Sequence, residues 1–119
     1  MAEKLQEFRK FREKMNRKIL ESGTTNTKRF FALDRACYQG GSLPVKTKEL
    51  MGLAASMVLR CDDCVAYHVI RLREEGATTE EFFEAFDVAL IVGGSIVIPH
   101  LRRAVDLLGD LERSGNGDE

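Results

Sequence analysis

The sequence predicts an all-α protein, and two observations support that prediction. Apolar residues recur with a helical period along most of the chain, and no stretch of useful length alternates between apolar and polar residues. The length of 119 residues suits one domain, and an apolar fraction of 44% is enough for a real core. We therefore expect a single domain over residues 1–119, with about six helices and a polar tail from about residue 113.

The first two helices are predicted from apolar stripes. Residues 3–21 should form an amphipathic helix ended by Gly23, because their apolar side chains fall within about a third of the helix circumference at ~100° per residue. A second helix is expected from about Asn26 to Tyr38. Its stripe includes Cys37, which we therefore expect to face the core as a small hydrophobic residue. The two stripes consist of Leu5, Phe8, Phe11, Met15 and Ile19, and of Phe30, Leu33 and Cys37.

Two further helices are expected in the middle of the chain. The stretch GGSLPV interrupts the helical pattern, and Pro44 suits the first turn of a third helix that runs to about Arg60. After a kink near Arg60, the stretch CDDCVAYHVIRLREE predicts a fourth helix, and Gly76 is a natural left-handed stop for it. The apolar face of the third helix consists of Leu50, Leu53, Ala54, Met57 and Val58.

The last part of the chain predicts two more helices. Thr78 and Glu81 match a capping box at the start of the helical stretch EEFFEAFDVALIV. Gly93 and Gly94 interrupt that stretch, and a final helix is expected from near Ser95. This final helix should fade into the polar sequence RSGNGDE.

The most apolar run, Val88 to Ile98, bears on membranes and on assembly. It has only eleven residues and is interrupted by two glycines, whereas a membrane-spanning helix needs ~20 apolar residues. We therefore expect no membrane segment. A chain this short cannot cover every apolar face of FFEAFDVALIVGGSIVI by itself, so we expect a homo-oligomer whose subunit interface buries it.

Charge and targeting signals exclude some classes of function. The formal net charge of -1 gives no overall field that would attract nucleic acid or an anionic membrane. No charged segment precedes an apolar one at the N-terminus, so no secretory signal is visible and we expect a cytoplasmic protein. We also expect no cofactor.

The stretch RCDDCVAYHV carries the candidate chemistry of the chain. On a helix, Cys61, Cys64 and His68 stand at positions i, i+3 and i+7 and share one face. Both sulfurs would lie at the helix N-terminus, where backbone N–H groups and the helix dipole favour a thiolate. Asp62 and Asp63 oppose that ionisation, because a nearby negative charge disfavours an ionised thiol. A base that takes the proton therefore matters more here than in a neutral motif.

Glu49 is the candidate for this base. It lies twelve residues before Cys61, at the edge of the apolar stripe beside Leu53, where a partly buried carboxylate could accept a proton. The cysteine count supports chemistry at the pair. Three cysteines are an odd number in a chain without an export signal, which argues against a structural disulfide framework and for redox chemistry or metal binding.

Alternatives remain open for each of these residues. The pair could be half of a zinc site, with His68 as the third ligand and Cys37 or His100 as the fourth. It could also belong to a purely structural helical module, in which His68 is a hydrogen-bonded core residue and Glu49 an acid that favours the helix dipole. His100 follows Pro99 near a helix start and is left outside the site.

The span KELMGLAASMVLRCDDCVAYHV resembles the AhpD-like alkylhydroperoxidase signature of the carboxymuconolactone decarboxylase superfamily. The likeness covers about Lys46 to Leu90 and rests on Glu49, Cys61, Cys64 and His68 at their offsets. It implies an AhpD-like helical bundle and a proton relay of Glu49, Cys61 and His68. This relay would activate Cys64, which attacks a hydroperoxide and becomes a sulfenic acid that Cys61 then resolves into a disulfide.

The resemblance also implies an activity, partners and an assembly. The expected activity is that of a thiol peroxidase or disulfide oxidoreductase, with a hydroperoxide as substrate and a thiol or lipoyl protein as reductant. The expected assembly is a hexamer built as a trimer of dimers. The lactone decarboxylases of the superfamily work without a cysteine pair, so the pair argues against decarboxylation. One departure is Asp63, which stands where the best-known AhpD members have a histidine.

Generic physics and the resemblance differ on which sulfur attacks. Generic physics favours Cys61, because it is nearest the helix terminus. The resemblance favours Cys64, which precedes His68 by one helical turn and so lies within reach of its imidazole. We follow the resemblance, because Asp62 and Asp63 oppose the dipole and leave the base as the decisive influence.

Overall fold

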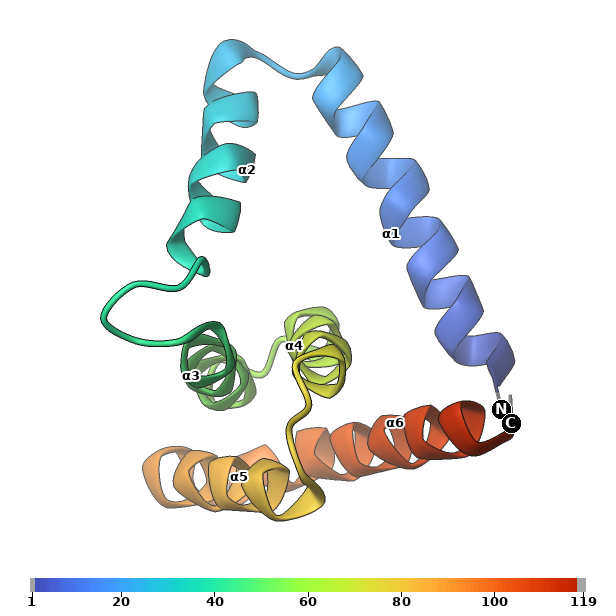
Figure 1. Ribbon diagram of the computed structural model, residues 1–119, viewed down its shortest axis with the longest axis vertical. Coiled ribbons are helices and arrows are strands. Elements are labelled where there is room, and N and C mark those ends of the chain that lie inside the picture. The colour runs from blue at the N-terminus through green and yellow to red at the C-terminus, as the bar shows by residue number, and fades with distance from the viewer. Residues whose placement is uncertain (1, 118–119) are drawn as a thin grey trace. The chain divides into compact units, whose positions relative to one another are not determined.

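The computed structural model describes residues 2–117, and the side chains of residues 3–113, as a set of α-helices (Figure 1). Within this range the helices are α1 (Ala2–Ser22), α2 (Thr25–Cys37), α3 (Val45–Val58), α4 (Asp62–Glu74), α5 (Thr79–Gly93), a short 3-10 helix η1 (Ser95–Val97) and α6 (Ile98–Gly117). No strand occurs in the part of the chain just given. The all-α class with about six helices is thus confirmed.

The chain divides into two compact units, residues 1–39 and residues 40–119. The first unit contains α1 and α2, whose connection is defined by local hydrogen bonds. The backbone N–H of Gly23 donates to the Ile19 carbonyl over 2.7 Å and ends α1 as expected. Thr24 caps α2, because its hydroxyl accepts from the Thr27 N–H while the Thr27 side chain accepts from the Thr24 N–H.

The apolar stripe of α2 is largely exposed, and the predicted burial of Cys37 is wrong. Phe30 and Leu33 are 69% and 60% exposed, and Cys37 at the end of the same stripe is exposed as well. The apolar period correctly predicted that α2 is a helix. It does not predict whether the apolar stripe is buried by this chain or by another one. A unit of two helices offers too little surface to bury all its apolar faces.

The second unit holds most of the buried core. Within it α3 packs against α4 and α5, and α4 packs against α6. Figure 1 views α3 and α4 along their axes, with α5 and α6 crossing beneath them. Leu53 and Met57, predicted on the apolar face of α3, are fully buried, and burial of each such side chain favours the fold by about 1.5–3 kcal/mol. The other large side chains of this core are Val69, Leu72, Phe82, Phe86 and Val97.

The breaks between helices follow the predicted signals closely. The kink between α3 and α4 lies at Arg60, which has a left-handed backbone with φ of 61°. Gly76, with φ of 82°, follows the end of α4, where a left-handed residue was expected. Gly94, with φ of 83°, separates α5 from η1, so the final α-helix starts at Ile98 after a 3-10 turn that begins at Ser95. α6 then continues to Gly117, into the segment expected as a polar tail.

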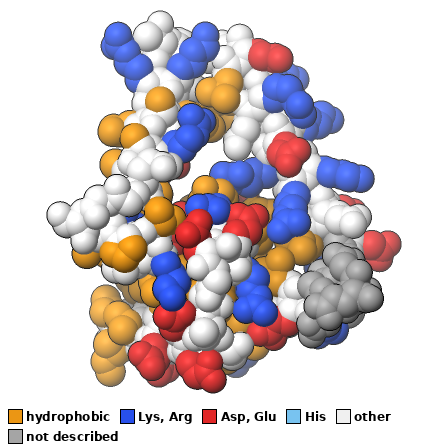
Figure 2. Space-filling model, viewed as in Figure 1, with side chains coloured by type: hydrophobic (Ala, Val, Ile, Leu, Met, Phe, Trp, Pro, Cys, Tyr) orange, Lys and Arg blue, Asp and Glu red, His pale blue; other side chains and the backbone are white. Residues whose placement is uncertain are grey.

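α5 exposes several of its apolar side chains. The exposed fractions are 42% for Phe83, 54% for Val88, 85% for Ile91 and 67% for Val92. Figure 2 shows hydrophobic side chains gathered over the α5 part of the second unit, at the lower left. A groove of about 560 Å³ between α3 and α5 is lined by Thr47, Leu50, Met51, Ala54, Glu81, Glu84, Ala85 and Val88. None of the helices within the described residues is long and apolar enough to cross a membrane.

The predicted capping box of α5 is present and lowers the pKa of Glu81. The Glu81 carboxylate accepts the Thr78 N–H over 2.9 Å, and the Glu81 N–H donates to the Thr78 hydroxyl over 3.1 Å. Lys46 of α3 also binds this carboxylate, with an N–O distance of 3.0 Å. The Thr78 N–H, and after it Lys46, hold the pKa of Glu81 below its ordinary value of 4.5.

Glu81→Gln should therefore lower stability in a pH-dependent way. A carboxyl group whose pKa is lower in the folded state stabilises the fold above its unfolded value, here 4.5, and loses that contribution as the pH falls through the folded value. We expect the variant to be less stable than the wild type at neutral pH, with a difference that shrinks below pH 4.5. Urea unfolding from neutral to about pH 3 measures this difference. The matched control is Glu80→Gln, and a Glu81→Gln deficit that stays constant with pH would contradict the assignment.

Candidate functional site

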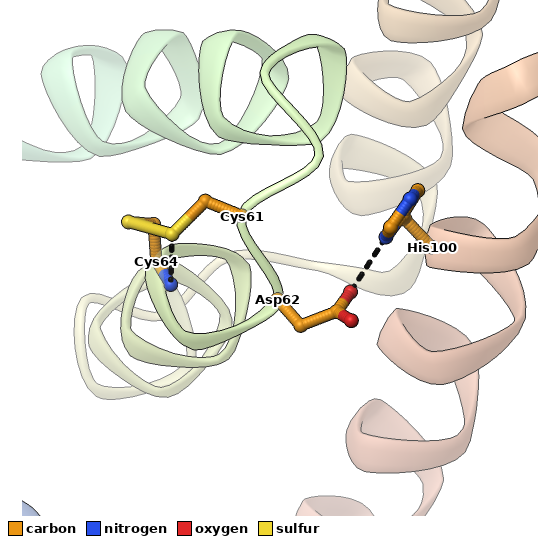
Figure 3. The surroundings of a disulfide bond; sticks show 4 residues. All are labelled: Cys61, Asp62, Cys64 and His100. Carbon is orange, nitrogen blue, oxygen red and sulfur yellow. Dashed lines mark hydrogen bonds and ion pairs between the residues drawn. A yellow bond between two sulfur atoms is a disulfide. The ribbon is translucent and has the colours of Figure 1, made fainter.

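Cys61 and Cys64 form a disulfide at the N-terminus of α4 (Figure 3). Their Cα atoms lie 5.3 Å apart, within the first turn of the helix. Cys61 is the N-cap residue, and its sulfur accepts a hydrogen bond from the Cys64 N–H over 3.3 Å. Cys61 is half-buried, whereas Cys64 is exposed. The predicted position of both sulfurs at a helix start is confirmed, and the sulfur of Cys64 belongs to the more accessible residue.

The left-handed turn at Arg60 places this pair. The N–H groups of Leu59, Arg60 and Cys61 all bond back to carbonyl groups of the last turn of α3, so the chain reverses there before α4 begins. A non-glycine residue with positive φ is uncommon and costs roughly 1–2 kcal/mol. The fold tolerates this cost at the residue that directly precedes the cysteine pair.

Glu49 and His68 form a buried pair that joins α3 to α4. The Glu49 carboxylate oxygen Oε1 lies 2.7 Å from Nδ1 of His68, and the two residues are 1% and 7% exposed. Glu49 lies on the face of α3 that also carries Leu53, as its position in the sequence predicted. His68 follows Cys64 by one helical turn on α4, so their side chains project from neighbouring positions on one face. The structure therefore places an acid–imidazole pair one turn below the disulfide.

Arg71 is a third charged residue next to the Glu49–His68 pair, and it was not predicted from the sequence. Its Nε lies 3.8 Å from the second carboxylate oxygen of Glu49, Oε2, which is buried and has no hydrogen-bond partner among the described residues. Arg71 also binds Glu74 over 2.8 Å and Glu75 over 3.2 Å. The hydrogen bond to Glu74 is the main influence that raises the pKa of Arg71, with the charge of Glu49 adding to it and partial burial opposing it. The only signal in the sequence was its spacing of three residues after His68.

His100 also lies close to the site, although it was predicted to lie outside it. Its Nδ1 is 2.7 Å from the Asp62 carboxylate, and Arg103 lies 3.5 Å from the other oxygen of that carboxylate. Both partners come from α6, which packs against α4. Nothing in the local sequence around His100 indicates a contact with a residue 38 positions away.

The arrangement gives no support to the zinc alternative. The two sulfurs that it would use as ligands are bonded to each other, and His68 and His100 are each bound to a carboxylate. Among the residues that the structure describes, no group of three or more His, Cys, Asp or Glu side chains is arranged to hold a metal ion. Of the four predicted site residues, the structure thus brings Cys61 to Cys64 and Glu49 to His68. Their catalytic roles stay predictions.

Fold and site together define an all-α protein with a disulfide-forming Cys-X-X-Cys pair at a helix N-terminus. The sequence model of the carboxymuconolactone decarboxylase family matches residues 25–107, well over half of the chain. The chain belongs to this family. The predicted likeness to the family is thereby confirmed.

Two relatives of known sequence are similar to part of this chain. A Paracoccus denitrificans protein, called uncharacterized protein 4 in cox locus, is 32% identical over 83 residues, which cover 70% of this chain and 75% of the relative. An uncharacterized protein of Cupriavidus necator is 35% identical over 65 residues, which cover 55% of this chain and 58% of that relative. Neither name states an activity.

Solved structures are similar over almost the full chain. Two crystal structures of one Thermotoga maritima protein are 60% identical, with TM-scores of 0.92 and 0.89, and cover 94% and 95% of this chain and 98% and 97% of their own. That protein is described as a carboxymuconolactone decarboxylase family protein with a suggested involvement in antioxidative response. The apo form of a Legionella pneumophila family member is 26% identical with a TM-score of 0.66, over 92% of this chain and 90% of its own.

Proposed function

We propose that the protein is a thiol peroxidase that reduces hydroperoxides through the Cys61–Cys64 pair. The observation that carries this proposal is the disulfide at the start of α4, with an exposed Cys64 one helical turn before the buried Glu49–His68 pair. A disulfide that closes within one turn is available as a two-electron centre. The suggested antioxidative role of the Thermotoga maritima relative supports the same chemistry.

In the first step the reduced Cys64 loses its proton and attacks the peroxide. Glu49 accepts the hydrogen bond of the Nδ1–H of His68, which makes Nε2 the ring nitrogen that can take a proton. His68 takes the proton of the Cys64 thiol directly, or the proton moves through a relay that connects Cys64 to Glu49 by way of Cys61 and a water molecule. The thiolate then attacks the terminal peroxide oxygen, the O–O bond breaks, and the alkoxide takes the proton back from His68 and leaves as an alcohol. Cys64 is oxidised to a sulfenic acid.

In the second step Cys61 resolves the sulfenic acid. The Cys61 thiol attacks the Cys64 sulfur, the S–O bond breaks, and water leaves with the Cys61 proton. The product is the disulfide that the structure contains. A dithiol reductant of a thiol or lipoyl protein then restores both thiols by disulfide exchange and becomes a disulfide itself. We propose this reductant together with the activity. It would reach the disulfide at the exposed Cys64.

Counting thiols tests this proposal. The reduced chain has three cysteines, and one equivalent of hydroperoxide should remove two thiols per chain and produce one equivalent of alcohol. Cys37→Ser is the matched control, because it removes the exposed cysteine that lies outside the disulfide and should lose the same two thiols. A metal assay on the same sample covers the zinc alternative. Unchanged thiols, or one zinc per chain, would contradict the proposed activity.

We propose that the protein is also a homo-oligomer, and the resemblance gives a hexamer built as a trimer of dimers. The exposed apolar side chains of α5 support an interface on this helix, since Ile91 is 85% exposed. Light scattering at micromolar concentration should therefore find a species larger than a monomer. Ile91→Glu should shift that species toward smaller forms, whereas the control Ile91→Leu should not. A monomeric wild type would refute the assembly.

A further inference from the structure

The Asp62–His100 pair lies next to the disulfide but has no part in the chemistry proposed so far. Asp62 directly follows Cys61 and is the first residue of α4, whereas His100 belongs to the first turn of α6. Their side chains meet over 2.7 Å, with 15% of the His100 side chain exposed. Figure 3 shows the Asp62 side chain turned toward His100 and away from the two sulfurs. The contact therefore fixes where the charge of Asp62 lies.

An aspartate in the first turn of a helix could also turn toward the start of its own helix. Its carboxylate is attracted to the N–H groups and positive dipole end of the same helix, where here it would approach the cysteine pair. A negative charge close to a thiol disfavours its ionisation. The direction in which Asp62 points thus decides how strongly it opposes a thiolate at this terminus.

We propose that His100 is a positioning residue for the cysteine pair, which holds the Asp62 carboxylate away from the sulfurs. His100 acts through Asp62 and not on the sulfurs themselves. The inference rests on the proposed function, because it concerns the reactivity of the reduced pair. It also accounts for how a helix start with two aspartates can present a reactive thiol.

Other charged groups of this region belong to α3, α4, α6 and the turn at Arg60. Arg103 of α6 binds the same carboxylate over 3.5 Å, but its side chain is 64% exposed, so solvent screens its charge. Asp63 is exposed on α4 and forms a second negative charge in the first turn. Arg60 directly precedes the cysteine pair and is exposed. The buried Glu49 of α3 is bound to His68. His100 is the member of this group that is in hydrogen-bond contact with Asp62 and has only 15% of its side chain exposed.

The test is the rate at which iodoacetamide alkylates the reduced pair as a function of pH. All variants carry Cys37→Ser, so that only the pair is followed. His100→Ala should slow alkylation at neutral pH by roughly three- to tenfold and shift the pH profile of the rate toward higher pH, as expected for an unscreened nearby negative charge. His100→Asn should slow it less, because its amide N–H can still hold Asp62. Circular dichroism verifies that each variant is folded.

A comparison of two backgrounds shows whether His100 acts through Asp62. In an Asp62→Asn background, His100→Ala should change the alkylation rate less than twofold, because the charge that it controls is gone. In an Asp63→Asn background, His100→Ala should keep its full effect. An unchanged rate in His100→Ala and His100→Asn, or an equal loss in both backgrounds, would overturn the proposal. Alkylation needs no peroxide, so the result stands apart from a failure of the proposed peroxidase activity.

Discussion

Cys64→Ser is expected to reduce peroxide consumption to the background rate, and Cys61→Ser to leave a sulfenic acid on Cys64. Cys64 is exposed and precedes His68 by one turn, and in our proposal a peroxide reaches its sulfur and the His68 imidazole takes its proton. Without Cys61 no resolving thiol is present, and dimedone labelling followed by mass spectrometry should find the adduct on Cys64. In Cys64→Ser, Cys61 should stay largely unlabelled at the same peroxide concentration and pH.

Two features of the site favour different sulfurs as the nucleophile: the helix terminus favours Cys61 and the proposed relay favours Cys64. The Cys61 sulfur accepts the Cys64 N–H at the N-cap, so the helix terminus stabilises negative charge on Cys61. In our proposal this makes Cys61 a good leaving thiolate when the disulfide is reduced. Labelling of Cys61 in Cys64→Ser, with none of Cys64 in Cys61→Ser, would show that the helix terminus outweighs the relay. Cys37→Ser serves again as the control and should consume peroxide at the wild-type rate.

Glu49→Gln is expected to lower the rate of peroxide consumption by roughly 100-fold or more, the usual contribution of a general base. A glutamine carbonyl can still accept the hydrogen bond of His68 Nδ1 but cannot hold a proton for the relay. Its shape matches that of glutamate, so the melting temperature should remain nearly unchanged. Steady-state kinetics with a hydroperoxide and thermal unfolding of the same sample measure the two effects separately.

The matched control for this substitution is Glu74→Gln. Glu74 binds Arg71 from the exposed side, so its replacement removes a carboxylate from the same arginine without affecting the hydrogen bond to His68. We expect this control to retain most of the wild-type rate. Unchanged turnover in Glu49→Gln would make Glu49 a structural residue, and an equal loss in both variants would assign the effect to Arg71.

The sequence was sufficient where structure depends on neighbours along the chain. The break at Arg60, the left-handed Gly76 and the box formed by Thr78 and Glu81 all appear where their local chemistry predicted them. The closeness of Cys61 and Cys64 could also be predicted from the sequence, because two residues three positions apart at a helix start lie one turn apart independently of the rest of the fold.

Contacts between helices were harder to predict. The residue pair Asp62 and His100 is separated by 38 positions, and neither its spacing nor its residue types indicate which elements meet. The Glu49–His68 contact spans 19 positions and was predicted only through a family resemblance. Cys37 shows the opposite error, since its apolar stripe is real but is not covered within the unit that carries it.

The closure of the disulfide within a single turn bears on how the protein would resist oxidative damage by the proposed hydroperoxide substrate. The Cα atoms of Cys61 and Cys64 lie 5.3 Å apart, a spacing from which a disulfide forms without backbone rearrangement. A sulfenic acid on Cys64 would meet its resolving thiol before a second peroxide molecule arrives, because no segment has to unfold first. Irreversible overoxidation to sulfinic acid should then be rare, and the protein should remain usable at peroxide concentrations that inactivate a lone reactive cysteine.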